Sequence, residues 1–104
     1  MSEHCLVTVT CASRAEAEAL ASGILEKRLA ACVQLTEITS FYIWKGAFNK
    51  APEVLLLIKT REDRYPALED HVVRHHAYEV PEIVQVPIRN GLAAYLGWID
   101  EVTR

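Results

Sequence analysis

Three side chains in this sequence could act together in chemistry, namely the thiol of Cys11 and the imidazoles of the adjacent pair His75 and His76. A thiolate together with imidazoles suits copper or zinc, so these residues form a candidate metal site. Their spacing is not that of a zinc finger. Neighbouring helical residues point about 100° apart, so both histidines reach one ion only if the helix unwinds at His76 or a second subunit contributes. The alternative is that the histidines interact with the last carbonyls and the dipole of a helix ending there.

Other residues whose side chains could bind a ligand or react have simpler structural interpretations. Glu53 precedes an apolar run, and is either a solvated strand end or a carboxylate that reaches a cleft near the second helix. Tyr42 and Trp44 are interpreted as packing residues, because no basic groove accompanies them. Cys32 lies between two apolar segments, where a free cysteine is usually buried. The sequence has no Ser-His-Asp signature, no Gly-rich phosphate loop and no H-E-x-x-H motif, so we expect no enzyme.

The composition is that of an ordinary globular protein, with 51% apolar and 24% charged residues. A chain of 104 residues predicts one domain, spanning residues 1–104. The net charge is −3 and the basic residues are scattered, which argues against a nucleic-acid surface. No basic and apolar leader opens the chain, and its longest apolar run, Val54–Ile58, is too short to span a bilayer. We therefore expect a cytosolic protein without membrane contact.

The three cysteines, Cys5, Cys11 and Cys32, do not predict a disulfide framework, because their number is odd and no C-x-x-C pair occurs. Cys5 and Cys11 lie on the same face of a predicted strand. At about 3.3 Å per residue they stand about 20 Å apart, so they cannot bridge each other within one subunit.

The elements that position these residues follow from the hydrophobic periodicity. Residues 4–11 alternate with period two, which predicts a strand. Ser13 and Glu16 match a capping box, which predicts a helix over about residues 14–30. Gly23 inside that helix indicates a close backbone approach.

The middle of the chain predicts one long β-hairpin. Its first strand covers residues 32–46 and its second residues 53–60, which are apolar enough to be covered on both faces. The apolar phase slips at Thr36–Glu37, which predicts a β-bulge. The predicted turn between the strands contains three residues that favour turns and interrupt strands: Gly46, Asn49 and Pro52.

The remaining residues predict a helix, a strand and a helix. A capping box at residues 60–63, or Asp63 alone as the N-cap, predicts a helix over about residues 63–76. Pro66 then lies in its first turn, where proline is tolerated. Residues 82–88 form a short strand, and their proline marks an edge or a strand end. Residues 92–102 form an amphipathic helix whose aromatic side chains dock on the sheet.

This order of elements predicts an α+β protein with a ferredoxin-like βαββαβ architecture, in which two helices cover one face of four antiparallel strands. Right-handed crossovers put the first and third strands in the centre and the other two at the edges. The hairpin strands are longer than the others, so part of the ribbon has no partner within the subunit. An open apolar edge would aggregate, and we therefore expect an obligate closed oligomer.

Five segments that cover most of the chain resemble one known family, the CutA divalent-cation tolerance proteins. These segments are LAACV at 29–33, SFYIWKG at 40–46, EVLLLIKT at 53–60, YEVPEI at 78–83 and YLGWI at 95–99. The resemblance implies a ferredoxin-like fold with a long hairpin and a C-terminal helix, assembled as a homotrimer similar to the nitrogen-regulatory PII proteins.

The resemblance also implies a ligand and a site. Family members are linked to copper tolerance, so Cu(II), or another divalent cation, is the expected ligand. The family site uses a cysteine that ends the first strand and the histidines before the Tyr-Glu motif, which here are Cys11, His75 and His76. Glu53 matches a family carboxylate in the same cleft. Ala77 stands where the family usually has proline, so the loop after His76 is less rigid.

The leading hypothesis is a trimeric cytosolic protein that binds a divalent metal ion, copper above all, and takes part in divalent-cation tolerance. The alternative is a PII-like signalling, small-ligand or protein-interaction module in which metal binding is incidental. A hydrolase is a third and weaker alternative.

Overall fold

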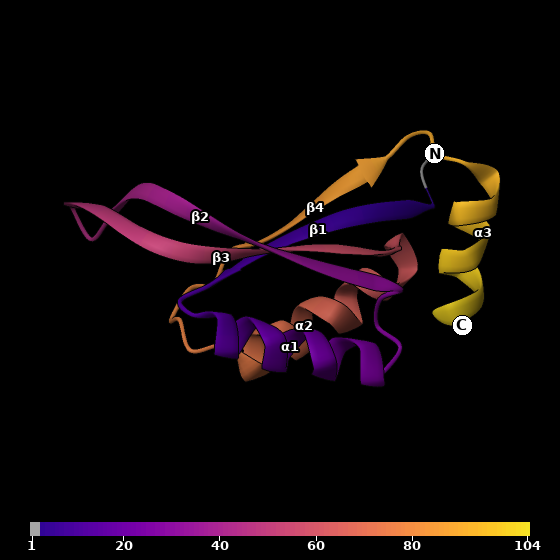
Figure 1. Cartoon of the computed structure of the whole chain (residues 1–104), viewed down its shortest axis with the longest axis horizontal. Helices are drawn as coiled ribbons and strands as arrows, with labels where there is room; N and C mark the ends of the chain where they lie inside the picture. Colours follow the sequence, from indigo (N-terminus) through magenta and orange to yellow (C-terminus); the bar gives the residue numbers. More distant parts are fainter. Residues whose placement is uncertain (1–2) are drawn as a thin grey trace.

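The strand β1, His4–Cys11, lies at the centre of the structure. The computed structural model describes residues 3–104, and its four strands form one antiparallel sheet in the order β2-β3-β1-β4, in which the edge strand β2 is Cys32–Trp44 (Figure 1). β1 pairs with β3, Ala47–Arg61, on one side and with β4, Ile83–Ile88, on the other. The predicted ferredoxin-like α+β fold, with the first and third strands in the centre, is confirmed.

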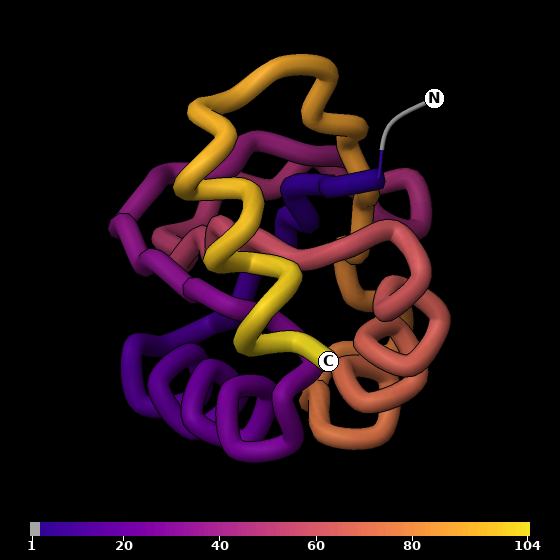
Figure 2. Tube along the Cα trace, turned by 90° about the vertical axis from the view of Figure 1, so that its right-hand side faces the viewer, coloured from indigo at the N-terminus to yellow at the C-terminus, as the bar shows by residue number. Residues whose placement is uncertain are grey.

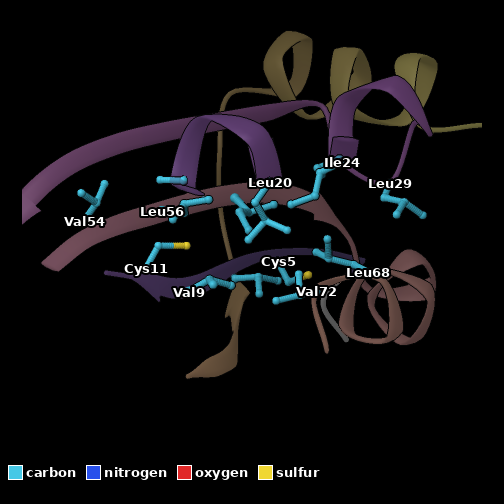
Figure 3. Packing of buried hydrophobic residues seen from close by; sticks show 14 residues of the cluster. Cys5, Val9, Cys11, Leu20, Ile24, Leu29, Val54, Leu56, Leu68 and Val72 are labelled. Carbon is cyan, nitrogen blue, oxygen red and sulfur yellow. The ribbon is translucent and has the colours of Figure 1, made fainter. Parts of the chain in front are cut away.

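The core lies between the sheet and the helices α1, Arg14–Glu26, and α2, Tyr65–His75, which cover the same face (Figures 1 and 3). In β1 every second side chain points to the face that the helices cover, and on that face Cys5, Val7, Val9 and Cys11 are buried. Leu20 and Ile24 of α1 meet these residues from the helical side (Figure 3). Each fully buried valine, leucine or isoleucine of this layer contributes about 1.5–3 kcal/mol through its burial, so the layer holds both helices on the sheet.

The helix α1 begins where the sequence predicts and ends earlier. The hydroxyl of Ser13 accepts the N–H of Glu16 at 3.2 Å, as expected of a cap. At the other end Arg28 has a φ of 57°, and the N–H of Leu29 donates to the carbonyl of Ile24. This is a Schellman motif, which ends a helix through a residue in the left-handed conformation. The predicted extension of the helix to residue 30 is therefore wrong. The sequence did not reveal this helix end, because arginine stands where such motifs usually carry glycine.

The hairpin turns at Lys45 and Gly46, whose φ angles are 52° and 79°. Two central residues with positive φ connect strands tightly and match their twist. The hairpin strand β2 is Cys32–Trp44. The prediction that the turn reaches Asn49 and Pro52 is wrong, since both lie within β3. Pro52 is tolerated because β1 no longer pairs with β3 there, so the strand has an open edge.

The register between β2 and β3 is constant over residues 32–44 of β2, so the predicted bulge at Thr36–Glu37 is wrong. Glu37 pairs with Val54, which is also the first residue of β3 that pairs with β1. The apolar phase therefore changes where the ribbon leaves the four-stranded sheet, because beyond that point β1 no longer flanks β3 and large apolar side chains such as Ile43 and Phe48 are exposed.

Residues 38–53 extend as a free ribbon beyond the sheet, at the left of Figure 1. The predicted overhang is thus confirmed. It exposes apolar side chains that a single chain does not cover: Phe41 (62%), Ile43 (76%), Trp44 (42%) and Phe48 (75%).

The helix α2 begins without a side-chain cap, after a short 3-10 turn at Glu62–Arg64. The predicted capping box is wrong, because the hydroxyl of Thr60 donates to the carbonyl of Leu29 at 2.8 Å instead. Pro66 lies in the first turn as expected, since its missing N–H costs nothing there. The helix ends at His75, which leaves the next histidine outside it.

The helix α3, Ala93–Val102, crosses the end of the sheet (Figure 2). Ile99 is its fully buried anchor, and His4 of β1 bonds Asp100 at 2.8 Å. The predicted docking of its aromatic side chains is only partial, because Tyr95 and Trp98 stay 38% and 40% exposed. Neither α3 nor any other helix within residues 3–104 is long and apolar enough to cross a membrane.

All three cysteines are free. Cys5 and Cys11 are buried in the core, whereas Cys32 is partly exposed. The prediction of a core position for Cys32 is therefore wrong, because this residue begins β2, which lies at the edge of the sheet.

Candidate functional site

A cleft of about 340 Å³ opens where the end of β1 meets the end of α2, and we call it the β1–α2 cleft. The predicted metal-site residues Cys11, His75 and His76 all line it, together with His71 of α2 and Gly23 of α1. Cys11 comes from the last position of β1, and the histidines come from the last turns of α2 and the residue after it. Tertiary packing thus gathers groups that lie more than sixty residues apart in the chain.

Two backbone hydrogen bonds fix the ring of His76. The helix ends at His75, and His76 is extended with φ −99° and ψ 142°, so the helix unwinds at this residue. Nδ1 of His76 accepts the N–H of Tyr78 at 3.1 Å and therefore carries no proton. The proton of the neutral ring is on Nε2, which donates to the carbonyl oxygen of Thr10 at 2.7 Å. His76 thus ties the loop after α2 to the end of β1, and both of its nitrogens are engaged.

His75 has the opposite arrangement. Its Nδ1 lies 2.7 Å from the carbonyl oxygen of His71, and because a carbonyl only accepts, Nδ1 carries the proton. The interpretation that a histidine contacts the last carbonyls of this helix is confirmed for His75. In the neutral ring the lone pair is then on Nε2. A backbone carbonyl bonded to one ring nitrogen is a common way of orienting the other nitrogen toward a metal.

His71 is absent from the predicted site, although its spacing to His75 puts both residues on one face of α2. The two rings stack with their centroids 4.2 Å apart. A Cβ at Gly23 would come within 3.2 Å of Nε2 of His71, so this glycine does mark a close approach of the helices. Burial lowers the pKa of His71, and the neighbouring charges of His75 and Lys27 lower it further. The i, i+4 spacing was the signal that could have identified it.

Cys11 is only 2% exposed, and its Sγ lies 3.7 Å from Nε2 of His76. Burial raises the pKa of the thiol to about 11, and the negative charges of Glu16 and Glu53 add to this rise. The group is therefore a thiol at neutral pH. A metal ion that binds the sulfur must first displace its proton.

These donors share a cleft without converging on one point. Across the residues that the structure describes, no three His, Cys, Asp or Glu side chains lie close enough together to hold a metal ion. Cys11 and His76 are in contact, and His75 lines the same cleft. A metal site made of Cys11, His75 and His76 therefore stays a prediction.

A second cleft, of about 430 Å³, lies where the ribbon leaves the sheet and faces the segment after α2; we call it the hairpin cleft. Glu53 lines it and accepts the hydroxyl of Tyr78 at 2.7 Å. Burial and this hydrogen bond raise the pKa of Tyr78. Glu53 is thus a carboxylate in a cleft rather than a solvated strand end. It does not line the cleft of Cys11, so the expectation that both share one cleft is wrong.

Known proteins resemble this chain in sequence. A family model described as CutA1 divalent ion tolerance protein matches residues 5–102. Protein CutA of Homo sapiens is 46% identical over 96 residues, which are 91% of this chain and 54% of the human protein. The chain therefore spans about half the length of that relative.

Solved structures resemble it in architecture. The periplasmic divalent cation tolerance protein CutA from Archaeoglobus fulgidus superposes with a TM-score of 0.95 at 40% identity, covering 97% of this chain and 99% of that one. CutA1 from Oryza sativa gives a TM-score of 0.95 at 39% identity, covering 99% of this chain and 95% of that one. Sequence and fold thus agree over nearly the whole chain.

Proposed function

The chain belongs to the CutA1 divalent ion tolerance family, and from this premise we propose that it acts in divalent-cation tolerance by binding Cu(II), or a similar divalent ion, in the β1–α2 cleft. The observation that supports this proposal is that one thiol and two imidazoles from the end of α2 line a single cleft: Cys11, His75 and His76. Thiolate and imidazole are donors that copper and zinc favour, whereas magnesium and calcium favour oxygen.

The donor chemistry fits such an ion, with Cys11 and His75 as the residues that would hold it. His75 carries a lone pair on Nε2 while Nδ1 is bonded to the carbonyl of His71. Cys11 offers sulfur once its proton is displaced. His76 would join them only by giving up one of its two hydrogen bonds, because its protonated Nε2 donates to the carbonyl of Thr10 and the lone pair of its Nδ1 accepts the N–H of Tyr78. The bound ion would supply the positive charge that favours the thiolate.

Replacing Cys11 with Ser, or His75 with Ala, is expected to weaken Cu(II) binding by roughly tenfold or more, since each change removes a ligand. The measurement is native mass spectrometry of the reduced protein with about one equivalent of Cu(II) per chain. Cys32→Ser and His4→Ala are matched controls outside the cleft and should bind like the wild type. Unchanged uptake by Cys11→Ser would remove this residue from the site.

We also propose that the protein assembles as a homotrimer through the ribbon at residues 38–53. The supporting observation is that β3 has an open edge before Val54, while apolar side chains of the ribbon are exposed in the single chain. Such edges aggregate unless a partner covers them, and pairing with neighbouring subunits in a closed ring does so.

Replacing Ile43, which is 76% exposed in the single chain, with Asp is therefore expected to reduce the mass from that of three chains toward that of one. Light scattering after size-exclusion chromatography measures the mass. Val73→Asp on the outer face of α2 is the matched control and should leave it unchanged. A wild-type mass of one chain at micromolar concentration would contradict the assembly.

The cytosol is our proposed location, because the three cysteines are free and a reducing compartment keeps them so. The archaeal relative described as periplasmic makes cell fractionation the deciding test. We further propose that the protein is not an enzyme. Turnover of generic ester or phosphate substrates by the purified protein would contradict this and favour the hydrolase alternative.

The alternative function, a PII-like signalling or small-ligand module, is favoured by one specific observation, the hairpin cleft. This cleft is larger than the β1–α2 cleft and is lined by neither cysteine nor histidine. A partner or ligand that binds equally with and without copper would support this alternative.

A further inference from the structure

His71 is a buried imidazole to which the fold gives no hydrogen bond. The residue is only 7% exposed, and it lines the β1–α2 cleft. His75 and His76 both have backbone partners, whereas within residues 3–104 neither ring nitrogen of His71 has one. Buried polar groups are nearly always hydrogen-bonded, because withdrawing them from water without a partner is unfavourable. A ligand that binds this ring from the cleft would offset that cost.

The backbone of α1 leaves room beside this ring. Gly23 lines the same cleft, and a Cβ on it would lie 3.2 Å from Nε2 and 3.5 Å from Cε1 of His71. The first distance is shorter than side-chain carbons normally allow, so any residue larger than glycine would crowd this nitrogen. The missing side chain of Gly23 thus keeps a space open next to Nε2.

His75 puts a second imidazole beside the first. The two residues have the i, i+4 spacing that places side chains on one face of a helix, and their ring centroids lie 4.2 Å apart. Nδ1 of His75 is bonded to the carbonyl oxygen of His71, which leaves the lone pair of the neutral ring on Nε2. Paired imidazoles at this spacing bind zinc in the H-E-x-x-H motif. Val72 replaces the catalytic glutamate of that motif, so the spacing indicates binding rather than hydrolysis.

The rest of the lining favours a cation over an anion. Its other charged residues are two carboxylates and one ammonium group, from Glu16, Glu26 and Lys27, which leaves one net negative charge. No residue of the ribbon at residues 38–53 lines the β1–α2 cleft. Assembly through the ribbon therefore does not use this surface.

We propose that His71 and His75 form a two-imidazole clamp for the divalent ion of the β1–α2 cleft, with Nε2 of His71 as a metal ligand beside Gly23. The inference rests on the proposed function and adds a ligand from α2 to it. It gives His76 a structural part instead, since both nitrogens of that ring bond the backbone. Imidazole suits copper and zinc, whereas magnesium prefers oxygen, so Mg(II) should not compete for the clamp.

The metal affinity of the reduced full-length protein tests the proposal. Cu(II) and Zn(II), the second of which a thiol cannot reduce, are titrated against a competing chelator. His71→Leu removes both nitrogens and keeps a side chain of similar volume at this buried position. It should weaken the binding of both ions by roughly tenfold while the unfolding midpoint stays unchanged or rises. His4→Ala, outside the cleft, is the matched histidine control and should bind like the wild type.

Gly23→Ala tests the same site without removing any ligand. Alanine is favoured over glycine inside a helix, so α1 keeps its stability, while the new methyl group crowds Nε2 of His71. Metal binding should weaken by roughly three- to tenfold. Gly97→Ala in α3 is the matched control, because a Cβ there meets nothing within 4 Å.

Electron paramagnetic resonance of the Cu(II)-loaded protein gives a signature that a purely structural role of His71 would not change. The spectrum should show coupling to two imidazole nitrogens in the wild type and to one in His71→Leu. Coupling to two nitrogens in both proteins would exclude His71 as a ligand.

The affinities separate a failure of the clamp from a failure of the proposed function. Unchanged affinity in a folded His71→Leu protein would overturn the clamp, and the metal proposal would still stand if Cys11→Ser and His75→Ala weakened binding. Equal losses in Gly23→Ala and Gly97→Ala would show that the space beside Nε2 is not involved, which also overturns the clamp. No uptake of either ion by the wild type would contradict both the clamp and metal binding in the cleft.

Discussion

Replacing Leu68 with Ala is expected to lower the free energy of unfolding by about 2–5 kcal/mol, the range for a leucine removed from a packed core. Leu68 is fully buried and faces the sheet from α2. The loss combines the transfer free energy of the side chain with the cavity that remains, because the sheet and α1 cannot close around it. Urea unfolding at fixed protein concentration measures the change.

The matched control for Leu68 is Leu92→Ala, since Leu92 is 75% exposed just before α3. Its stability should change by no more than about 0.5 kcal/mol. Equal losses at the two positions would contradict the assignment of the core. Because Leu68 holds α2 on the sheet, the variant should also loosen His71 and His75, and thus weaken copper binding if the metal site is where we propose.

Raising the pH from about 9 to about 11 is expected to destabilise the protein through its two buried thiols. Burial, with a further contribution from the charge of Glu62, raises the pKa of Cys5 from 9.0 to about 11, and Cys11 reaches a similar value. The unfolded chain loses these protons from pH 9 upward, whereas the folded chain keeps them until about pH 11. The stabilisation is therefore complete below pH 9 and lost as the pH rises through that interval.

The size of this loss is about 2–3 kcal/mol for each thiol, since one pKa unit corresponds to about 1.4 kcal/mol. Denaturant unfolding at a series of pH values measures it. The double variant Cys5→Ala/Cys11→Ala should flatten the profile between pH 9 and 10. Above that interval tyrosines contribute in the same direction, because burial raises the pKa of Tyr65 to about 12.

Cys32→Ala is the control for this experiment, because it leaves both buried thiols in place and should keep the alkaline loss. If the double variant and the wild type lose stability equally between pH 9 and 10, the thiols are not the cause. The same titration is informative for function, because the proton that burial retains on Cys11 is the one that a metal ion must displace.

The fold was largely predictable, because its determinants are local and periodic. Period-two alternation in residues 4–11 specifies which face of β1 is buried, and the structure buries Cys5, Val7 and Val9 on it. The cap at Ser13 uses only neighbouring residues and was also predicted correctly. The errors concern places where distant contacts compete with local signals. The hydroxyl of Thr60, for example, bonds Leu29 across the sheet rather than capping the helix that follows.

The candidate site was predictable only as a set of residue types. Cys11, His75 and His76 were identified from the sequence, and they do line one cleft. Their different hydrogen bonds were not predictable, because the partners of His76 are backbone atoms of Thr10 and Tyr78, which the fold places around its ring. His71 was missed because a histidine on the apolar side of a helix resembles any other buried residue.

By itself, then, the sequence determined the order of the elements, the buried faces and the excess length of the hairpin, since each depends on periodicity along the chain. Tertiary structure alone decided that Glu53 and Cys11 lie in different clefts and which nitrogen of each histidine carries the proton. The physical reason is that a side chain's chemistry depends on groups within hydrogen-bonding distance, and in this protein those groups come from distant parts of the chain.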